Sequence, residues 1–177
     1  SISKSNIKEI ENISKSIGIE WFSTPMYTEA VELLDPFVNR FKIREFDSRQ
    51  LIKNKSSEIM DKILETNKEV IISSQISPKN CSYYKNQKIK WLYCIPKYPC
   101  KLNEFDFKKI NEFNGFSNHC THILAPITAS ILGAEIIEIH ITSDKSKKFV
   151  DNNVSFNYNE LETIVNHIRL IEKMHIH

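Results

Sequence analysis

The sequence predicts an α/β protein with a parallel β-sheet, and two observations support this fold class. Short apolar runs typical of buried strands alternate with segments of helical periodicity along nearly the whole chain. Polar or reactive side chains stand at the end of each apolar run. Because strands that alternate with helices form right-handed βαβ units, we expect the order α-βα-βα-β-βα-βα-βα.

The first half of the chain begins with a helix. Isoleucines at positions 7, 10, 13 and 17 have roughly helical spacing and predict a helix over 2–17, which ends at Gly18. Residues 19–25, IEWFSTP, predict a short strand closed by Pro25. The following elements are a helix over 28–37 with Thr28 as its N-cap, a strand over 40–46, a helix from Ser48 or Asn54 to about 66, and a buried strand over 68–74.

The second half opens with a polar connection over 75–88 that shows no clear helix. The expected elements are then a strand over 90–96, a helix from Asn103 or Asp106 to about 114, a strand over 114–119, a helix over 121–132, a strand over 135–142 and a helix over 159–173. Gly133 is a typical C-terminal stop for the helix before it.

The strand ends decide between two parallel architectures. A doubly wound open sheet gathers its ligand-binding groups mainly at one switch point, whereas a barrel carries them around its whole C-terminal rim. All six predicted strands end in such groups: Ser23 and Thr24; Lys42, Arg44 and Glu45; Ser73 and Ser74; Lys97 and Tyr98; Ser117 and His119; Glu138 and His140. We therefore predict a TIM barrel, (β/α)8. A complete barrel has about 250 residues, so this chain should hold about six of eight βα units, as one partial barrel domain over 1–177.

Composition excludes several functional classes. The net charge is only +2 and lysines are mixed with acidic residues, which argues against a nucleic-acid-binding surface. Neither GxGxxG nor GxxxxGK[ST] occurs. The longest apolar stretch, near 123–141, is interrupted by Pro126, Glu135 and Glu138 and should not cross a membrane. The four cysteines lack metal-finger spacing and are expected as free thiols in a reducing cytoplasm.

Two histidines stand at similar places, near the ends of successive strands. Side chains alternate along a strand, so Glu138, His140 and Thr142 share one face and the isoleucines between them share the other. Ser117 and His119 share a face in the same way. Neighbouring strands lie about 4.8 Å apart, so two inward imidazoles can reach one metal ion. The alternative is that each histidine is a hydrogen-bonded core residue, and the pattern alone leaves both readings open.

At these residues the sequence resembles the sialic acid synthase family, which also makes legionaminic and pseudaminic acids. The matching stretches are GIEWFSTP, FKI, VIISS, YCIPKYP, GFSNHCTH and LGAEIIEIHIT, in family order, followed by the region to Asp151. The resemblance implies a barrel that condenses phosphoenolpyruvate with an N-acetylated amino-sugar aldehyde of the N-acetylmannosamine type, using Mn²⁺ or Mg²⁺.

The resemblance also implies roles for particular residues. His119 and His140 match metal ligands; Lys42, Ser73 and Ser117 match positions that bind phosphoenolpyruvate; Thr24, Tyr98 and Asp151 match substrate-contacting positions; Glu138 and Asp47 match catalytic carboxylates. Each has a structural alternative. Lys42 can pair with Glu45, the two serines can simply end strands, and Asp151 can be a turn residue.

The sequence also departs from the family pattern. Arg44, Glu45 and Phe46 replace small residues, and the usual Ser-Asp-His reads Ser117-Asn118-His119. The family's first two strands and its C-terminal antifreeze-like domain have no counterpart in these 177 residues. We therefore expect a fragment of a longer gene product, a barrel completed by a second chain in a homodimer or by a complementing chain, or a degenerate homologue. Two other functions remain open: a non-catalytic partner subunit of such a synthase, and a different metal-dependent barrel aldolase.

Overall fold

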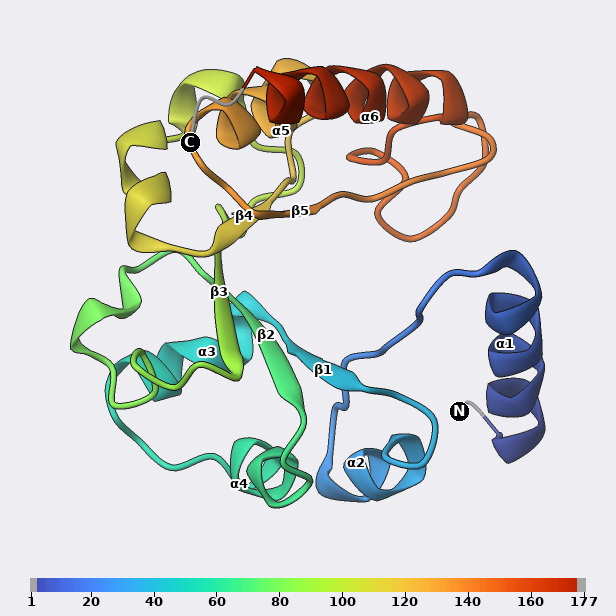
Figure 1. The fold of residues 1–177 in the computed structure, drawn as a ribbon, viewed down its shortest axis with the longest axis vertical. Coiled ribbons are helices and arrows are strands. Elements are labelled where there is room, and N and C mark those ends of the chain that lie inside the picture. Colours follow the sequence, from blue (N-terminus) through green and yellow to red (C-terminus); the bar gives the residue numbers. More distant parts are fainter. Residues whose placement is uncertain (1–2, 175–177) are drawn as a thin grey trace. The chain divides into compact units, whose positions relative to one another are not determined.

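A computed structural model describes residues 3–174, and in this part of the chain five parallel strands run in the order β1-β2-β3-β4-β5 (Figure 1). The strands are β1 (Arg40–Ile43), β2 (Glu69–Ser74), β3 (Ile89–Tyr93), β4 (Gly115–Ser117) and β5 (Ile136–Glu138). The helices are α1 (Lys4–Ile17), α2 (Thr28–Leu34), α3 (Glu45–Ile52), α4 (Glu58–Glu65), α5 (Leu124–Ile131) and α6 (Tyr158–Lys173). Three 3₁₀ segments complete the list: Pro78–Asn80, Leu102–Glu104 and Phe107–Glu112.

The chain divides into two compact units. The described residues up to Ile72, with Cys81–Lys90, form the first unit, and Ser73–Asn80 with the chain from Trp91 onward form the second. The α/β class and the parallel sheet are confirmed. Residue 2, where the predicted first helix begins, lies outside the described residues.

The first unit begins with α1, whose ends follow from local chemistry. The Ser3 side chain accepts a hydrogen bond from the Asn6 backbone N–H, and Asn6 reciprocates in a capping box. Gly18 ends the helix with a φ of 71°, in the left-handed region that suits glycine, as predicted. Of the four isoleucines that predict this helix, Ile7 is buried and the other three are exposed.

The predicted strand over 19–25 is reduced to a single parallel bridge between Ser23 and Phe41. The Lys42 N–H donates to the Ser23 carbonyl at 3.1 Å. In a parallel ladder the next bond would run from the N–H of residue 25 to the Lys42 carbonyl, and Pro25 has no N–H. The chain therefore shows five strands in the described part and one bridge where a sixth strand was predicted.

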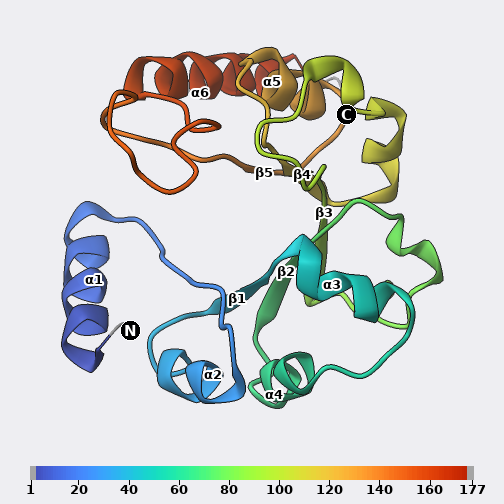
Figure 2. The same cartoon turned by 180° about the vertical axis from the view of Figure 1, so that it is seen from behind.

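Two predicted helices of the first unit also differ. The helix expected up to about residue 66 is two helices, α3 and α4, and the Ser57 hydroxyl caps the second by accepting from the Met60 N–H. Thr28 is not the cap of α2, because the N-cap is Tyr27 and makes no side-chain capping bond. α2 and α4 lie side by side in both views (Figures 1 and 2).

In the second unit, β4 lies between β3 and β5. Leu92 pairs with Gly115, and Gly115 in turn pairs with Ile136. A Cβ at position 115 would stand 2.2 Å from the Ile136 carbonyl oxygen, so only glycine fits this close approach. The same register places Ser117 opposite Glu138, at the carboxyl ends of β4 and β5.

The core of this unit lies between the strands and α5. Its buried members are Tyr93, Ile95, Cys100, Phe105, Ile110, Phe116, Cys120, Ala125, Ala129 and Ala134. Phe116 on β4 contacts the rings of Tyr93, Phe105 and Phe107. The last two phenylalanines come from the segment predicted as one helix up to residue 114, which forms 3₁₀ turns instead.

The strands predicted over 114–119 and 135–142 are present but shorter, because β4 ends at Ser117 and β5 ends at Glu138, before the two histidines. α5 is followed by Gly133 at a φ of 98°, as expected for a stop. α5 and α6 lie side by side (Figure 2). Ile137 packs against the core cluster, as the alternation over 135–142 predicts, whereas Ile141, predicted on the same face, is exposed. All four cysteines are free and buried. Among the described residues no helix combines the length and the apolar character needed to cross a membrane.

Candidate active site

The candidate site lies where β4 and β5 end, in the second unit. Ser117 is the last residue of β4, and Glu138 is the last residue of β5. His119 lies two residues after the end of β4, and His140 lies two residues after the end of β5. The Ser117 hydroxyl, which is buried, donates to Glu138 Oε1 at 2.6 Å. This bond joins a predicted phosphoenolpyruvate-binding residue to a predicted catalytic carboxylate across neighbouring strands.

The two imidazoles lie close together. The ring centroids of His119 and His140 are 5.5 Å apart, with 45° between the ring planes. The paired positions at strand ends, from which sequence reasoning expected proximity, therefore bring the rings to one place.

His119 is the more firmly held of the two imidazoles. Its side chain is almost fully buried, at 5% exposure, and its Nδ1 lies 2.7 Å from the Ile95 carbonyl oxygen. A carbonyl only accepts, so Nδ1 carries the proton and Nε2 carries the lone pair of the neutral ring. Metal-ligating histidines typically show this arrangement, in which one ring N–H is fixed by a carbonyl.

His140 is more open. Its side chain is about one third exposed, and its Nδ1 lies 4.0 Å from Asp151 Oδ2. Asp151 adopts a φ of 59°, a left-handed conformation that aspartate tolerates. The His140 carbonyl accepts from the Phe156 N–H at 2.8 Å, which fixes the backbone beyond the end of β5.

Tyr98 connects the two imidazoles. Its ring stacks on His119 with centroids 3.9 Å apart and meets His140 edge-on at 5.8 Å. The Asn153 side-chain amide donates to the Tyr98 carbonyl at 3.3 Å. Sequence reasoning selected Tyr98 as a substrate contact and gave no signal for its stacking on a histidine 21 positions away.

The other selected residues are placed as follows. Ser73 is buried at the end of β2 in the second unit. In the first unit, Lys42 is buried on β1 and its ammonium group donates to the Ile43 carbonyl at 3.0 Å. Thr24 is half-buried and follows the Ser23 bridge. Asp47 lies in the first turn of α3, where Arg44 binds both of its carboxylate oxygens at 2.7 and 3.1 Å.

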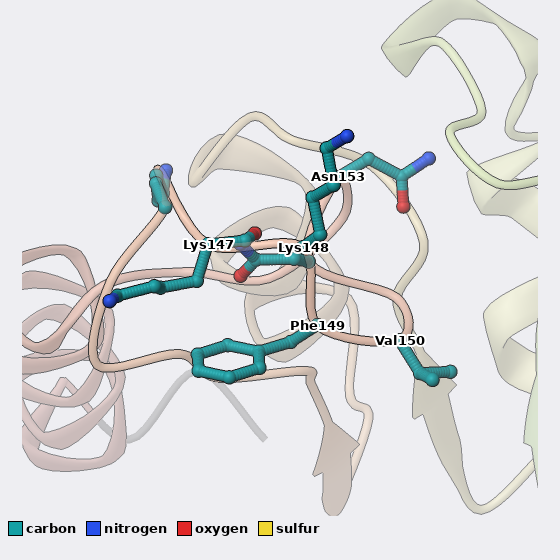
Figure 3. A pocket seen from close by; sticks show the side chains of 7 residues that line it. Lys147, Lys148, Phe149, Val150 and Asn153 are labelled. Atoms are coloured by element: carbon teal, nitrogen blue, oxygen red, sulfur yellow. The ribbon is translucent and has the colours of Figure 1, made fainter.

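The loop between β5 and α6, which contains Asp151, forms a hollow of about 490 Å³ (Figure 3). It is lined by Lys145, Lys147, Lys148, Phe149, Val150, Asn152 and Asn153. The side chains of Lys147 and Lys148 extend in different directions, so their charges do not converge on one point. Lys145 is paired with Glu160 at 2.5 Å.

Cys100, whose side chain is buried, is hydrogen-bonded to the backbone of His119. The Cys100 N–H donates to the His119 carbonyl at 3.0 Å. Burial, with a further contribution from nearby Cys120, raises the pKa of the Cys100 thiol to about 11. Cys100 is therefore a neutral packing residue at neutral pH rather than a nucleophile.

The site offers two imidazoles to a divalent metal ion. In the part of the chain that the structure describes, no three His, Cys, Asp or Glu side chains come close enough to hold a metal ion. Two imidazoles at 5.5 Å with a carbonyl-fixed Nδ1 fit a site that has two protein ligands and leaves the other positions to water and substrate oxygens.

Fold and site together define a class: a parallel α/β protein whose candidate active site stands at the carboxyl ends of its strands. A model of the NeuB family matches residues 1–176, and the chain belongs to that family.

Relatives and solved structures agree with this assignment. An uncharacterised protein of Methanocaldococcus jannaschii is 31% identical, over 98% of this chain and 54% of that protein. The pseudaminic acid synthase of Campylobacter jejuni is 30% identical, over 93% of this chain and 51% of that protein.

The crystal structure of an N-acetylneuraminic acid synthetase from Leptospira borgpetersenii matches with a TM-score of 0.86 and 25% identity, over 98% of this chain and 64% of that chain. The chain thus spans about half the length of the curated relatives it matches.

Proposed function

We propose that this chain carries a nonulosonate synthase centre, which condenses phosphoenolpyruvate with an N-acetylated amino-sugar aldehyde of the N-acetylmannosamine type. Membership of the NeuB family and likeness to pseudaminic acid synthase support this proposal. The observation that carries it is the imidazole pair at the ends of β4 and β5, with ring centroids 5.5 Å apart.

His119 and His140 are the groups that would hold Mn²⁺ or Mg²⁺. A bound divalent ion supplies a Lewis acid that polarises the carbonyl oxygen of the open-chain sugar. His119 presents Nε2 because Nδ1 is used on the Ile95 carbonyl. His140 is more exposed and adjusts to the substrate, with Asp151 beside its other nitrogen.

The phosphoenolpyruvate side rests on a cation and hydroxyl donors. In the second unit, Ser73 and Ser117 provide hydroxyls suited to phosphate and carboxylate oxygens. Lys42, in the first unit, is the cation that the family resemblance assigns to phosphoenolpyruvate. The Ser117 hydroxyl is held by Glu138, so it is already oriented before substrate arrives. Carbon 3 of phosphoenolpyruvate attacks the aldehyde carbon, water adds at carbon 2, and phosphate leaves.

The sugar side involves Thr24, Tyr98 and Asp151, with Glu138 accepting a sugar hydroxyl. Asp47 is the remaining predicted catalytic carboxylate. Its two oxygens are engaged by Arg44, so Asp47 must exchange that partner in order to act on substrate.

The test is a discontinuous assay of the chain with phosphoenolpyruvate, N-acetylmannosamine and Mn²⁺, followed by phosphate release and product mass. The expected result is phosphate release that requires both substrates and disappears in His119→Ala and His140→Ala. Product formed without phosphoenolpyruvate would point to an aldolase and overturn the proposal. Inactivity at micromolar protein in the presence of every component would also overturn it for this chain alone.

A second candidate function is a partner subunit that completes, or is completed by, another synthase chain or a second copy. One observation favours it: Ile10, Ile13 and Ile17 of α1 leave an apolar stripe exposed. Light scattering of the chain alone and mixed with a full-length synthase separates the cases. A complex whose mass equals the sum of the two chains supports the partner-subunit function. Two peaks with the masses of the separate proteins contradict it.

A further inference from the structure

Asn118 stands immediately before His119 and is fully buried, at 0% exposure. Its side-chain Nδ2 donates to the Cys120 carbonyl at 2.7 Å, and its Oδ1 accepts from the Cys120 N–H at 3.2 Å. One carboxamide thus binds both backbone polar groups of the residue that follows His119. The backbone N–H of Asn118 itself donates to the Glu138 carbonyl at 2.9 Å.

This clamp lies where the regular strand has ended. β4 stops at Ser117, so residues 118–120 no longer have a continuous ladder to fix their conformation. The His119 carbonyl accepts from the Cys100 N–H, and Cys100 forms a parallel bridge with Cys120. Three contacts therefore fix the backbone around His119. The Asn118 N–H is bonded to the Glu138 carbonyl, and the His119 carbonyl is bonded to the Cys100 N–H. The Asn118 amide holds the backbone of Cys120.

We propose that Asn118 is a positioning residue for His119. It holds residues 118–120 so that the imidazole keeps Nδ1 on the Ile95 carbonyl and offers Nε2 to ligands. Its importance for turnover rests on the proposed function, but the geometry it maintains does not. The residue pattern marks Asn118 as a departure from the usual Ser-Asp-His but does not show that its amide binds the backbone of Cys120.

An amide makes both bonds at once, whereas the aspartate that is usual at this position of the family can make only one as a carboxylate. A carboxylate only accepts, so Asn118→Asp keeps the bond from the Cys120 N–H and leaves the Cys120 carbonyl without its donor. Asn118→Ala removes both bonds. The two variants therefore form a graded series in which the aspartate keeps part of the clamp.

The test is nuclear magnetic resonance of the metal-free protein labelled with ¹⁵N-histidine, at a fixed pH of about 8.5, where imidazoles are neutral. Long-range ¹H–¹⁵N correlations report the tautomer of each ring, and His119→Gln assigns the signal. Wild-type His119 should be a single Nδ1–H tautomer with a slowly exchanging proton. Loss of both bonds should speed that exchange roughly tenfold in Asn118→Ala, with Asn118→Asp between.

Asn152→Ala is the matched control. The Asn152 amide also donates to two backbone carbonyls of the second unit, those of Asp144 and Lys147, but neither lies beside His119 in the chain. This variant should lose stability in thermal unfolding and leave the His119 signal unchanged.

Unchanged His119 exchange and tautomer in a folded Asn118→Ala protein would overturn the proposal. If that variant does not fold, an unchanged signal in Asn118→Asp would do the same. Mn²⁺ affinity provides a second readout and should fall about tenfold in Asn118→Ala. An inactive wild-type protein with the expected histidine signals would sink the proposed function and leave this inference standing.

Discussion

His119 and His140 occupy equivalent positions, each two residues past a strand, yet their surroundings differ. His119 is buried, stacked under Tyr98 and fixed through Nδ1 by a carbonyl. His140 is one third exposed, with only a carboxylate at 4.0 Å beside its ring nitrogen. We infer from this difference that His119 is the more rigid imidazole of the proposed site and His140 the more adjustable one.

The largest expected effect comes from a substitution that disturbs both strands that lead to the histidines. Gly115→Ala places a methyl group 2.2 Å from the Ile136 carbonyl oxygen and 2.8 Å from the Leu92 side chain, so β4 and β5 must separate. We expect a loss of about 3 kcal/mol in the free energy of unfolding, measured with urea, and loss of the Ser117–Glu138 contact. A stable Gly115→Ala protein would show that the close approach of the two strands is not needed.

The next effect distinguishes the two histidines. His119→Ala removes a buried ring and its bond to Ile95, so it should lower the free energy of unfolding by about 2 kcal/mol. His140→Ala removes a partly exposed ring and should cost less than about 1 kcal/mol. His167→Ala, on the exposed face of α6, is the control. Equal losses of unfolding free energy in the first two variants would contradict the inferred difference in rigidity between the two histidines.

Substitutions of Tyr98 test what holds the His119 ring in place. Tyr98→Ala removes the ring stacked on His119 and should cost about 1 kcal/mol. Tyr98→Phe keeps the ring and should retain most of the stability in the same urea titration. The His119 ring signals should shift more in the alanine variant than in the phenylalanine variant, and the reverse order would argue against the stack.

Substitutions of Asp151 test the surroundings of the His140 ring. Asp151→Asn tolerates the left-handed conformation and should keep the fold, whereas Asp151→Val places a β-branched residue at a φ of 59° and should cost about 1–2 kcal/mol. In both variants the ring signals of His140 should change and those of His119 should not. Coupled changes in both rings would mean that the loop holds the two together.

The sequence predicts the elements of this chain better than the contacts between them. Alternation in residues 135–142 correctly separates Ile137, toward the core, from Glu138, toward Ser117. Pro25 was expected to close a strand, but its effect on the ladder depends on which residue of β1 it would face. The helix expected before residue 114 was wrong because Phe105 and Phe107 pack into the aromatic cluster around Phe116.

The candidate site divides in the same way. The paired positions of His119 and His140 were visible as a pattern, and their rings do come together. The stacking of Tyr98 on His119 joins residues that are distant in sequence, so no local spacing predicts it. The clamp of Asn118 on Cys120 is local, but it depends on the backbone conformation that the chain adopts after β4 ends. The roles of Lys42, Ser73, Thr24 and Asp47 stay predictions, each tied to a local environment that the structure describes.

The central claim is that His119 and His140 ligate one divalent ion together. Electron spin-echo modulation of the Mn²⁺-loaded protein measures nitrogen coupling to the metal directly. The account predicts coupling from two imidazoles in the wild type and from one in each of His119→Gln and His140→Gln. Bound Mn²⁺ without nitrogen coupling, or coupling that both single variants leave intact, would contradict it.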